Sequence, residues 1–196
     1  MEAIVDKRDA IVEAAARELV STGISSFTVA RVARAAHASS ALVHYHFATK
    51  RRLLVAAAER LAARRTALRL ASLEGRRGLP ALDALWEALI AGAARDAERA
   101  WHDLLLLGRD DHDVAAVLLR ERRREESGLA AGLPRLLADL DSRPGIRPED
   151  LARLFVTFVD GVACSLALGA DASEVRGAYD AFCLALVALG QTTPAR

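Results

Sequence analysis

The chain has 196 residues, of which 53% are hydrophobic and 27% are charged, and its formal net charge at pH 7 is +1. This composition indicates a folded protein with one sizeable core or two smaller domains, and it excludes a disordered chain. The charged start "MEAIVDKRDA" argues against export, and no apolar run approaches the ~20 residues of a membrane span. We therefore expect a cytoplasmic protein with no membrane partner.

The residue usage favours helix along almost the whole chain. Alanine, leucine and arginine dominate, there are only 5 prolines, and no alternating β-branched run is long enough to predict a strand. We therefore expect an all-α fold. The two cysteines, Cys164 and Cys183, are expected to be free thiols in a reducing compartment.

The N-terminal third of the chain carries the signals of four helices. They are expected at residues 6–22, 29–36, 40–47 and 50–73. Gly23 ends the first helix, and hydroxyl side chains that can cap a helix N-terminus precede the other three, at Thr28, Ser39 and Thr49. A three-residue turn, "HAS", separates the short second and third helices. Together these features predict a helix-turn-helix unit.

After residue 73 the chain changes to longer helical patterns, separated by the breaks "EGRRGLP", "GRDDHD" and "DSRPGIRP". The helices are expected at residues 80–98, 99–108, 113–139, 149–169 and 173–189. Gly132 and Pro134 are expected to bend the third of them. We accordingly divide the chain into a three-helix helix-turn-helix domain at residues 1–52 and a second helical domain at residues 53–196.

The third helix, "SALVHYHF", predicts which side chains point outward. At about 100° per residue, Val43 and Phe47 share one face and Tyr45 lies on the opposite one. His44 and His46 flank Tyr45 and lie about 160° apart around the helix, so they cannot chelate one metal ion. Tyr45 is therefore expected to contact a partner, or else to pack on the neighbouring domain.

The charge pattern indicates a polyanion as that partner. Residues 19–58 contain no acid but five Lys or Arg residues and three histidines. Lys50, Arg51 and Arg52 fill the first turn of the fourth helix, where the helix dipole favours acids. A bound anion such as a DNA phosphate would compensate for this arrangement. The alternative is an ordinary solvated basic turn.

Residues 8–54 resemble the N-terminal region of TetR-family transcriptional regulators. The resemblance rests on a set of matching positions: Ile11, Ala14, Ala15, Gly23, Thr28, Val29, Ala36, Ser39, His46, Phe47, Lys50, Leu53 and Leu54. The chain departs from the family at His37, where the turn usually has Gly, at Ala41, where a small Gly or Pro is usual, and at His44, where Tyr is usual. His is among the residues that tolerate a left-handed backbone, so the first departure is compatible with the turn.

The resemblance implies that the third helix enters the major groove of double-stranded DNA, at a pseudo-palindromic operator. It implies phosphate contacts from Thr28 and Lys50 and base readout from residues 40–46. The expected DNA-binding residues are Thr28, Ser39, Ser40, Ala41, Leu42, His44, Tyr45, His46, Thr49 and Lys50. Ala41 and Leu42 are apolar, so they can touch thymine methyl groups but cannot hydrogen-bond to a base edge.

The second domain is expected to bind a ligand and to dimerise. On the last helix, a stripe of bulky residues (Val175, Tyr179, Phe182, Leu186, Leu189) lies beside a stripe of alanines (Ala178, Ala181, Ala185, Ala188). A helix that is apolar on most of its circumference must be buried on both sides. The resemblance implies that these faces form a homodimer through a four-helix bundle of the last two helices, and a thick monomeric core is the alternative. By the resemblance, a small-molecule effector binds among the middle helices, where the candidates are Trp86, Trp101, His102, Phe155, Phe158 and Asp160.

Two functions of different class remain. The first is a ligand-responsive DNA-binding regulator, a repressor that a small molecule releases from its operator. The second is a helical small-molecule-binding or catalytic protein that no longer binds DNA. No Ser/His/Asp set, Gly-rich phosphate loop or paired-carboxylate motif supports catalysis, so we expect no enzyme and no cofactor. The segment "RDDHDV" (109–114) gathers acids and a histidine, but its place between two helices favours a capped turn over a metal site.

Overall fold

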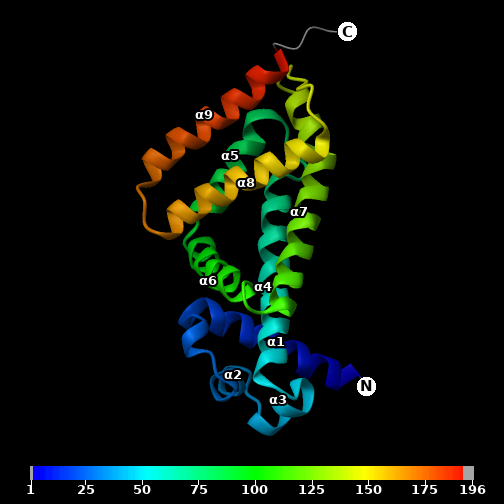
Figure 1. Cartoon of the computed structure of the whole chain (residues 1–196), viewed down its shortest axis with the longest axis vertical. Coiled ribbons are helices and arrows are strands. Elements are labelled where there is room, and N and C mark those ends of the chain that lie inside the picture. The colour runs from blue at the N-terminus through cyan, green and yellow to red at the C-terminus, as the bar shows by residue number, and fades with distance from the viewer. Residues whose placement is uncertain (1, 192–196) are drawn as a thin grey trace. The chain divides into compact units, whose positions relative to one another are not determined.

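Most of the chain is helical, as its alanine- and leucine-rich composition predicts. The computed structural model describes residues 2–191, with the side chains of residues 7–92 and 94–190. This part of the chain contains no strand, which confirms the all-α prediction (Figure 1). Its helices are α1 (Glu2–Thr22), the 3-10 helix η1 (Ile24–Ser26), α2 (Val29–Ala35), α3 (Ser40–Phe47), α4 (Lys50–Leu73), α5 (Gly78–Ile90), α6 (Gly92–Gly108), α7 (His112–Ala138), α8 (Pro148–Ala167) and α9 (Ala172–Gln191). None of these helices is both long enough and apolar enough to cross a membrane.

The predicted capping signals of the N-terminal helices are confirmed. The Thr28 hydroxyl accepts from the Arg31 N–H at 3.3 Å, the Ser39 hydroxyl from the Leu42 N–H at 3.1 Å, and the Thr49 hydroxyl from the Arg52 N–H at 3.1 Å. Each bond satisfies one of the N–H groups that a helix start leaves without an intrahelical partner. Gly23 follows α1 with a φ of 70°, a backbone conformation that only glycine adopts readily.

The predicted boundary between the helices at 80–98 and 99–108 is wrong. The break lies at Ala91, whose ψ of 135° is extended, so that α5 ends at Ile90 and α6 begins at Gly92. The buried residues of α5 end at Leu89, and those of α6 begin at Glu98. Helix α7 runs through Pro134 without interruption.

The chain divides into two compact units. Unit 1 comprises residues up to Arg65 together with Asp96–Glu121, and unit 2 comprises Thr66–Arg95 together with the residues from Arg122 onward. Helices α4, α6 and α7 therefore each contribute one part to unit 1 and another part to unit 2.

Unit 1 holds two apolar clusters. The first joins α1, α2, α3 and the start of α4, with Ile11, Phe27 and Val43 at its centre. The second joins the next turns of α4 to α6 and α7, with Trp101 and Leu104 fully or nearly buried. Leu107 of α6 packs against both clusters, so α6 belongs to the same packed body as the helix-turn-helix.

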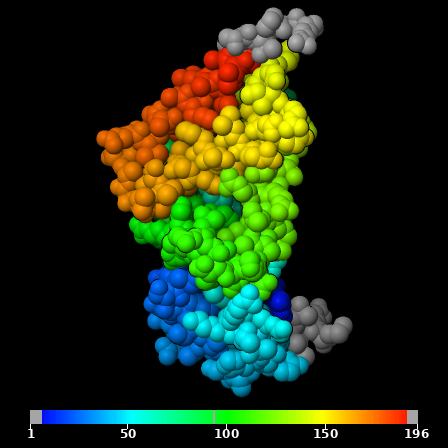
Figure 2. All heavy atoms as spheres, in the orientation of Figure 1, coloured from blue at the N-terminus to red at the C-terminus, as the bar shows by residue number. Residues whose placement is uncertain are grey.

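Unit 2 is built around one large cluster from α4, α5, α7, α8 and α9. Helices α8 and α9 lie side by side (Figures 1 and 2), and Phe158 stacks on Phe182 with ring centroids 3.8 Å apart. The buried Tyr179 hydroxyl donates to the Leu82 carbonyl at 2.8 Å, which ties α9 to α5. Both cysteines are free, as expected, and burial raises the pKa of the Cys183 thiol to about 11.

Candidate functional site

Helix α3 has the orientation that the sequence predicts. Val43 is 1% exposed and Phe47 is 5% exposed, whereas Tyr45 on the opposite face is 76% exposed. The tyrosine ring is largely exposed to solvent, and it lies edge to face with the His46 ring, with the ring centroids 5.2 Å apart. An exposed aromatic on a helix whose other face is locked into the core is well placed to contact a partner.

The ten predicted DNA-binding residues all lie in unit 1, at the start of α2, along α3 and at the start of α4. Leu42 and His46 are half-buried. The exposed ones are Thr28, Ser39, Ser40, Ala41, His44, Tyr45, Thr49 and Lys50. The capping hydroxyls of Thr28, Ser39 and Thr49 accept hydrogen bonds from backbone N–H groups, and each can still donate its own hydrogen to a phosphate oxygen.

Two residues with positive φ flank α3. His37 has a φ of 50° in the turn before the helix, so the histidine takes the left-handed backbone expected for this turn. Ala48 has a φ of 54° and a ψ of −43° immediately after the helix, and the Thr49 N–H donates to the Phe47 carbonyl across it at 2.5 Å. These residues form a γ-turn with a positive φ at its central residue, a strained conformation. The turn sets the direction of α4 relative to α3.

Residues 19–58, which contain no acid, hold five Lys and Arg residues, and two of these five form ion pairs with acids outside this segment. Arg31 pairs with Glu18 at 2.9 Å, and Arg51 pairs with Asp111 at 2.8 Å and Asp113 at 2.7 Å. These acids lie outside residues 19–58, so the sequence window alone does not reveal them. The three other cations of the window, Arg34, Lys50 and Arg52, make no side-chain ion pair with any residue that the structure describes.

The segment 109–114 is a capped turn, as expected. The Asp111 carboxylate accepts from the N–H groups of Asp113 at 3.0 Å and Val114 at 3.2 Å, at the start of α7. The Arg51 guanidinium, which hydrogen-bonds to this carboxylate, lowers the pKa of Asp111 and has its own pKa raised in return. Among the described residues, no group of three or more His, Cys, Asp or Glu side chains could hold a metal ion.

Two of the six predicted ligand-binding residues lie in unit 1 and four in unit 2. In unit 1, Trp101 is buried beneath the Arg65 guanidinium, 4.4 Å from the ring centroid, and the Nδ1 of the half-buried His102 lies 2.6 Å from the Glu98 carbonyl oxygen. In unit 2, Trp86 and Phe155 are core residues, and Phe158 is half-buried against α9.

Asp160 in unit 2 has the partners that an acid inside an apolar helix requires. Its carboxylate accepts from Arg69 of α4 at 2.7 Å and from Arg122 of α7 at 2.6 Å. Arg69 also pairs with the buried Glu125 of α7 at 3.2 Å. These contacts tie three helices of unit 2 together through charges. The role of Asp160 as a ligand-binding residue stays a prediction.

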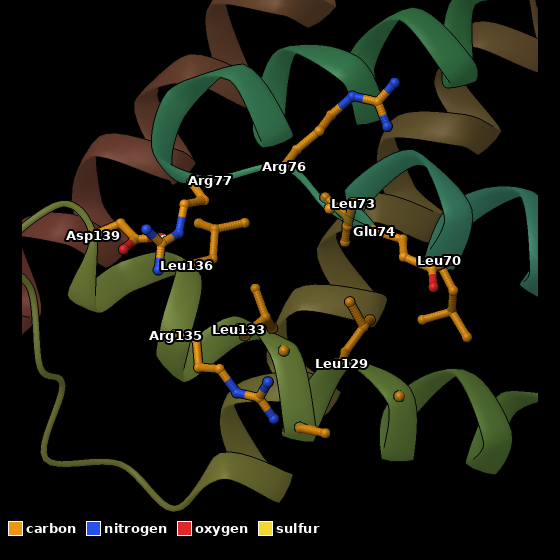
Figure 3. Close-up of a pocket in the computed structure, with 14 residues that line it drawn as sticks. Leu70, Leu73, Glu74, Arg76, Arg77, Leu129, Leu133, Arg135, Leu136 and Asp139 are labelled. Atoms are coloured by element: carbon orange, nitrogen blue, oxygen red, sulfur yellow. Dashed lines mark ion pairs between the residues drawn. The ribbon is translucent and has the colours of Figure 1, made fainter.

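A groove of about 640 Å³ lies in unit 2 between the end of α4, the α4–α5 turn and α7 (Figure 3). We call it the α4–α7 groove. Its apolar lining is made by Leu70, Leu73, Leu129, Leu133 and Leu136. Its charged lining is made by Glu74, Arg76, Arg77, Arg135 and Asp139. Sequence reasoning missed this groove, because its walls come from segments about sixty residues apart and from small residues of α7 that carry no chemical signal.

The alanine stripe of α9 is exposed at all four of its positions. Tyr179 and Leu186 of the bulky stripe are buried in unit 2, but Leu189 is 47% exposed and does not belong to the core. Leu154 of α8 and Leu184 of α9 are exposed as well. The core of a single chain therefore leaves an apolar surface on α8 and α9 uncovered.

Residues 11–57 match the family model described as bacterial regulatory proteins, tetR family. Among solved structures, a proposed TetR-family transcriptional regulator from Rhodococcus sp. is similar over 93% of this chain and 99% of that chain, with 22% identity and a TM-score of 0.76. A TetR transcription regulator from Haloarcula marismortui matches with 20% identity over 94% and 98% of the two chains and a TM-score of 0.74. A proposed transcriptional regulator from Saccharomonospora viridis, solved in complex with choline, matches with 20% identity over 91% and 95% and a TM-score of 0.74. The comparison with curated proteins gave no match.

Proposed function

We propose that this chain, which has the N-terminal domain and the fold of TetR-family transcriptional regulators, is a repressor that a small molecule releases from its operator. The observation that carries the proposal is the exposed Tyr45, which projects from a helix anchored by Val43 and Phe47. The surrounding residues 19–58 contain no acid, so that surface is suited to a polyanion. The proposed function involves no catalysis and takes place in the cytoplasm.

The proposed DNA contacts divide into two kinds. Lys50 and the hydroxyl of Thr28 bind phosphates and set the position of the domain, whereas the exposed residues of α3 read base edges in the major groove. The sequence prediction names Lys50 alone among the cations, and Arg34 and Arg52 join it as phosphate-contact candidates because no described acid pairs with them. Arg51 is set apart by its ion pairs with Asp111 and Asp113.

The proposed assembly is a homodimer formed through α8 and α9. The exposed alanines of α9 allow close approach of a second copy, and Leu154 and Leu184 add apolar area that association would remove from water. A two-fold axis would present two α3 helices to DNA. Such a dimer binds a pseudo-palindrome whose half-sites are about 34–36 Å apart, or a multiple of that distance.

The proposed effector binds the helical second domain and weakens operator binding. A solved protein of the same fold holds choline, which supports a small-molecule site in this architecture. Helix α4 is continuous from Lys50 to Leu73, so a ligand that shifts its last turns acts on the helix whose first turn carries the phosphate-binding lysine. The ligand would thereby change the spacing of the two α3 helices.

Footprinting of DNA from upstream of the chain's own gene and its neighbours tests the proposal. We expect a protected pseudo-palindrome with the half-site spacing given above. If folded, dimeric protein protects none of these fragments at physiological salt, the DNA-binding function is wrong, and the alternative of a helical protein without DNA binding takes its place.

A further inference from the structure

Helix α3 lacks the side chains that form two hydrogen bonds with one base. In the major groove, Arg or Lys forms such paired bonds with guanine, and Asn or Gln forms them with adenine. Residues 39–49, which comprise α3 and the caps on either side of it, contain no Arg, Lys, Asn, Gln, Asp or Glu. The helix must therefore distinguish base pairs by other contacts.

The polar groups that α3 does expose discriminate weakly between bases. Ser40 and His44 lie one turn apart on the same side of the helix, and each offers a single hydrogen-bonding group to a base edge. The hydroxyls of Ser40 and Tyr45 can both donate and accept, so either can bond to more than one base. These three residues add affinity, but none of them selects one base pair by itself.

Ala41 is the apolar side chain that α3 presents to solvent. Ala41 and Tyr45 each lie within about 20° of the direction opposite the buried Val43, at ~100° per residue. Leu42, the other apolar candidate, is half-buried and packs against the first cluster of unit 1. The 5-methyl group of thymine is the apolar group that a base pair shows in the major groove, so thymine is the base that matches the Ala41 methyl.

We propose that Ala41 reads one thymine in each half-site of the operator, by contact of its methyl group with the thymine 5-methyl. The contact removes both methyl groups from water, which makes it favourable without any hydrogen bond. The proposal names a base that α3 reads, and it rests on the DNA-binding part of the proposed function. The competing role for Ala41 is clearance alone, in which a small side chain lets the helix approach the groove and touches no methyl group.

Replacement of thymine by uracil in the operator separates the two roles, because uracil lacks only the 5-methyl group and keeps the same base pairing. The full-length wild type is titrated with operators in which each symmetry-related pair of thymines is replaced in turn. At one such pair, affinity should fall about fourfold per half-site, the effect of one buried methyl group, and about fifteenfold for both half-sites together. Thymines outside the half-sites are the internal control and should show no effect. Equal affinity for every uracil operator would overturn the proposal and leave Ala41 the clearance role.

Two variants assign the methyl contact to its residue. Ala41→Gly removes the methyl group, so it should bind the thymine operator and the uracil operator equally. Ser40→Gly is the matched control, because it places glycine in the same turn of α3 and keeps Ala41, so it should retain the preference for thymine. A thymine preference that persists in Ala41→Gly would show that another residue reads the methyl. The uracil titrations of the wild type decide the proposal even if Ala41→Gly fails to fold.

The converse change returns the methyl group to a different base. An operator with cytosine in place of the contacted thymine should gain about fourfold per half-site when that cytosine is exchanged for 5-methylcytosine. No gain would contradict a methyl contact. If the chain binds no DNA at all, the proposed function fails and this inference fails with it. If the chain binds its operator without regard to the methyl groups, this inference fails alone.

Discussion

Lys50, Arg51 and Arg52 follow one another in the first turn of α4, yet their surroundings differ. Arg51 pairs with Asp111, in the turn before α7, and with Asp113, in the first turn of α7. Lys50 and Arg52 are exposed and make no ion pair with a described residue. A basic first turn opposes the helix dipole, and only the two unpaired cations are free to offset this by binding phosphate.

We predict that Lys50→Ala weakens binding nearly equally to all DNA sequences, because it removes a phosphate contact and no base contact. The slope of log affinity against log salt concentration should fall by about one per protomer. Thermal stability should stay unchanged or rise slightly, since the Lys50 side chain is exposed, has no ion pair with a described residue and opposes the helix dipole. Filter binding or anisotropy at several salt concentrations measures the slope. A loss confined to one operator sequence would show that Lys50 reads bases instead.

The N-terminal helices could be predicted from sequence because their signals are local. A hydroxyl cap precedes each of α2, α3 and α4, and α3 is short enough that Val43 and Phe47 fix its orientation. The boundary at Ala91 carried no such signal, because an extended alanine is chemically the same as a helical one. The Arg51–Asp111 pair joins residues sixty positions apart, and no local pattern reveals it.

The ion pair between Arg51 of α4 and Asp111, in the turn before α7, should stabilise the fold. Asp111→Asn keeps an N-cap residue but removes the charge that Arg51 holds, so it should lower the thermal midpoint at pH 7 by a few degrees. Arg51 lowers the pKa of Asp111 in the folded state, so this stabilisation is present above the ordinary carboxyl pKa and is lost as pH falls through the lower folded value. The wild type and the variant should therefore converge in acid.

Asp110→Asn, in the same turn but without a side-chain ion pair to a described residue, is the control and should match the wild type at every pH. Thermal melts between pH 7 and pH 3 provide the measurement. A difference between wild type and Asp111→Asn that persists undiminished in acid would mean that the charge of Asp111 is not what stabilises this turn.

The whole molecule leaves apolar surface on α8 and α9 that the core of one chain does not cover. The sequence predicted this arrangement from the alanine stripe, but it placed Leu189 with the core, where the structure has it 47% exposed. The groove between α4 and α7 could not be predicted, because a hollow depends on how two distant segments pack and not on either pattern alone.

We predict that Ala185→Glu converts a dimer to a monomer, because it would bury an unpaired charge in the interface of two copies. Ala185 is exposed in the single chain, so the variant should fold and keep its helical content. Sedimentation velocity at micromolar concentration compares it with the wild type and with Ser173→Glu, which adds the same charge in the first turn of α9. Monomeric wild type would refute the homodimer, and a dimeric Ala185→Glu would place the interface elsewhere.

Operator affinity of Tyr45→Ala, measured together with its thermal midpoint, tests the central claim that α3 is the DNA-reading helix. Tyr45 is exposed and opposite the core, so the variant should melt as the wild type does and bind its operator about tenfold more weakly or worse, the ~1–3 kcal/mol of one base contact. Val43→Asp is the control with the opposite result, since it buries a charge and should unfold the domain. A folded Tyr45→Ala that binds the operator with wild-type affinity would contradict the account.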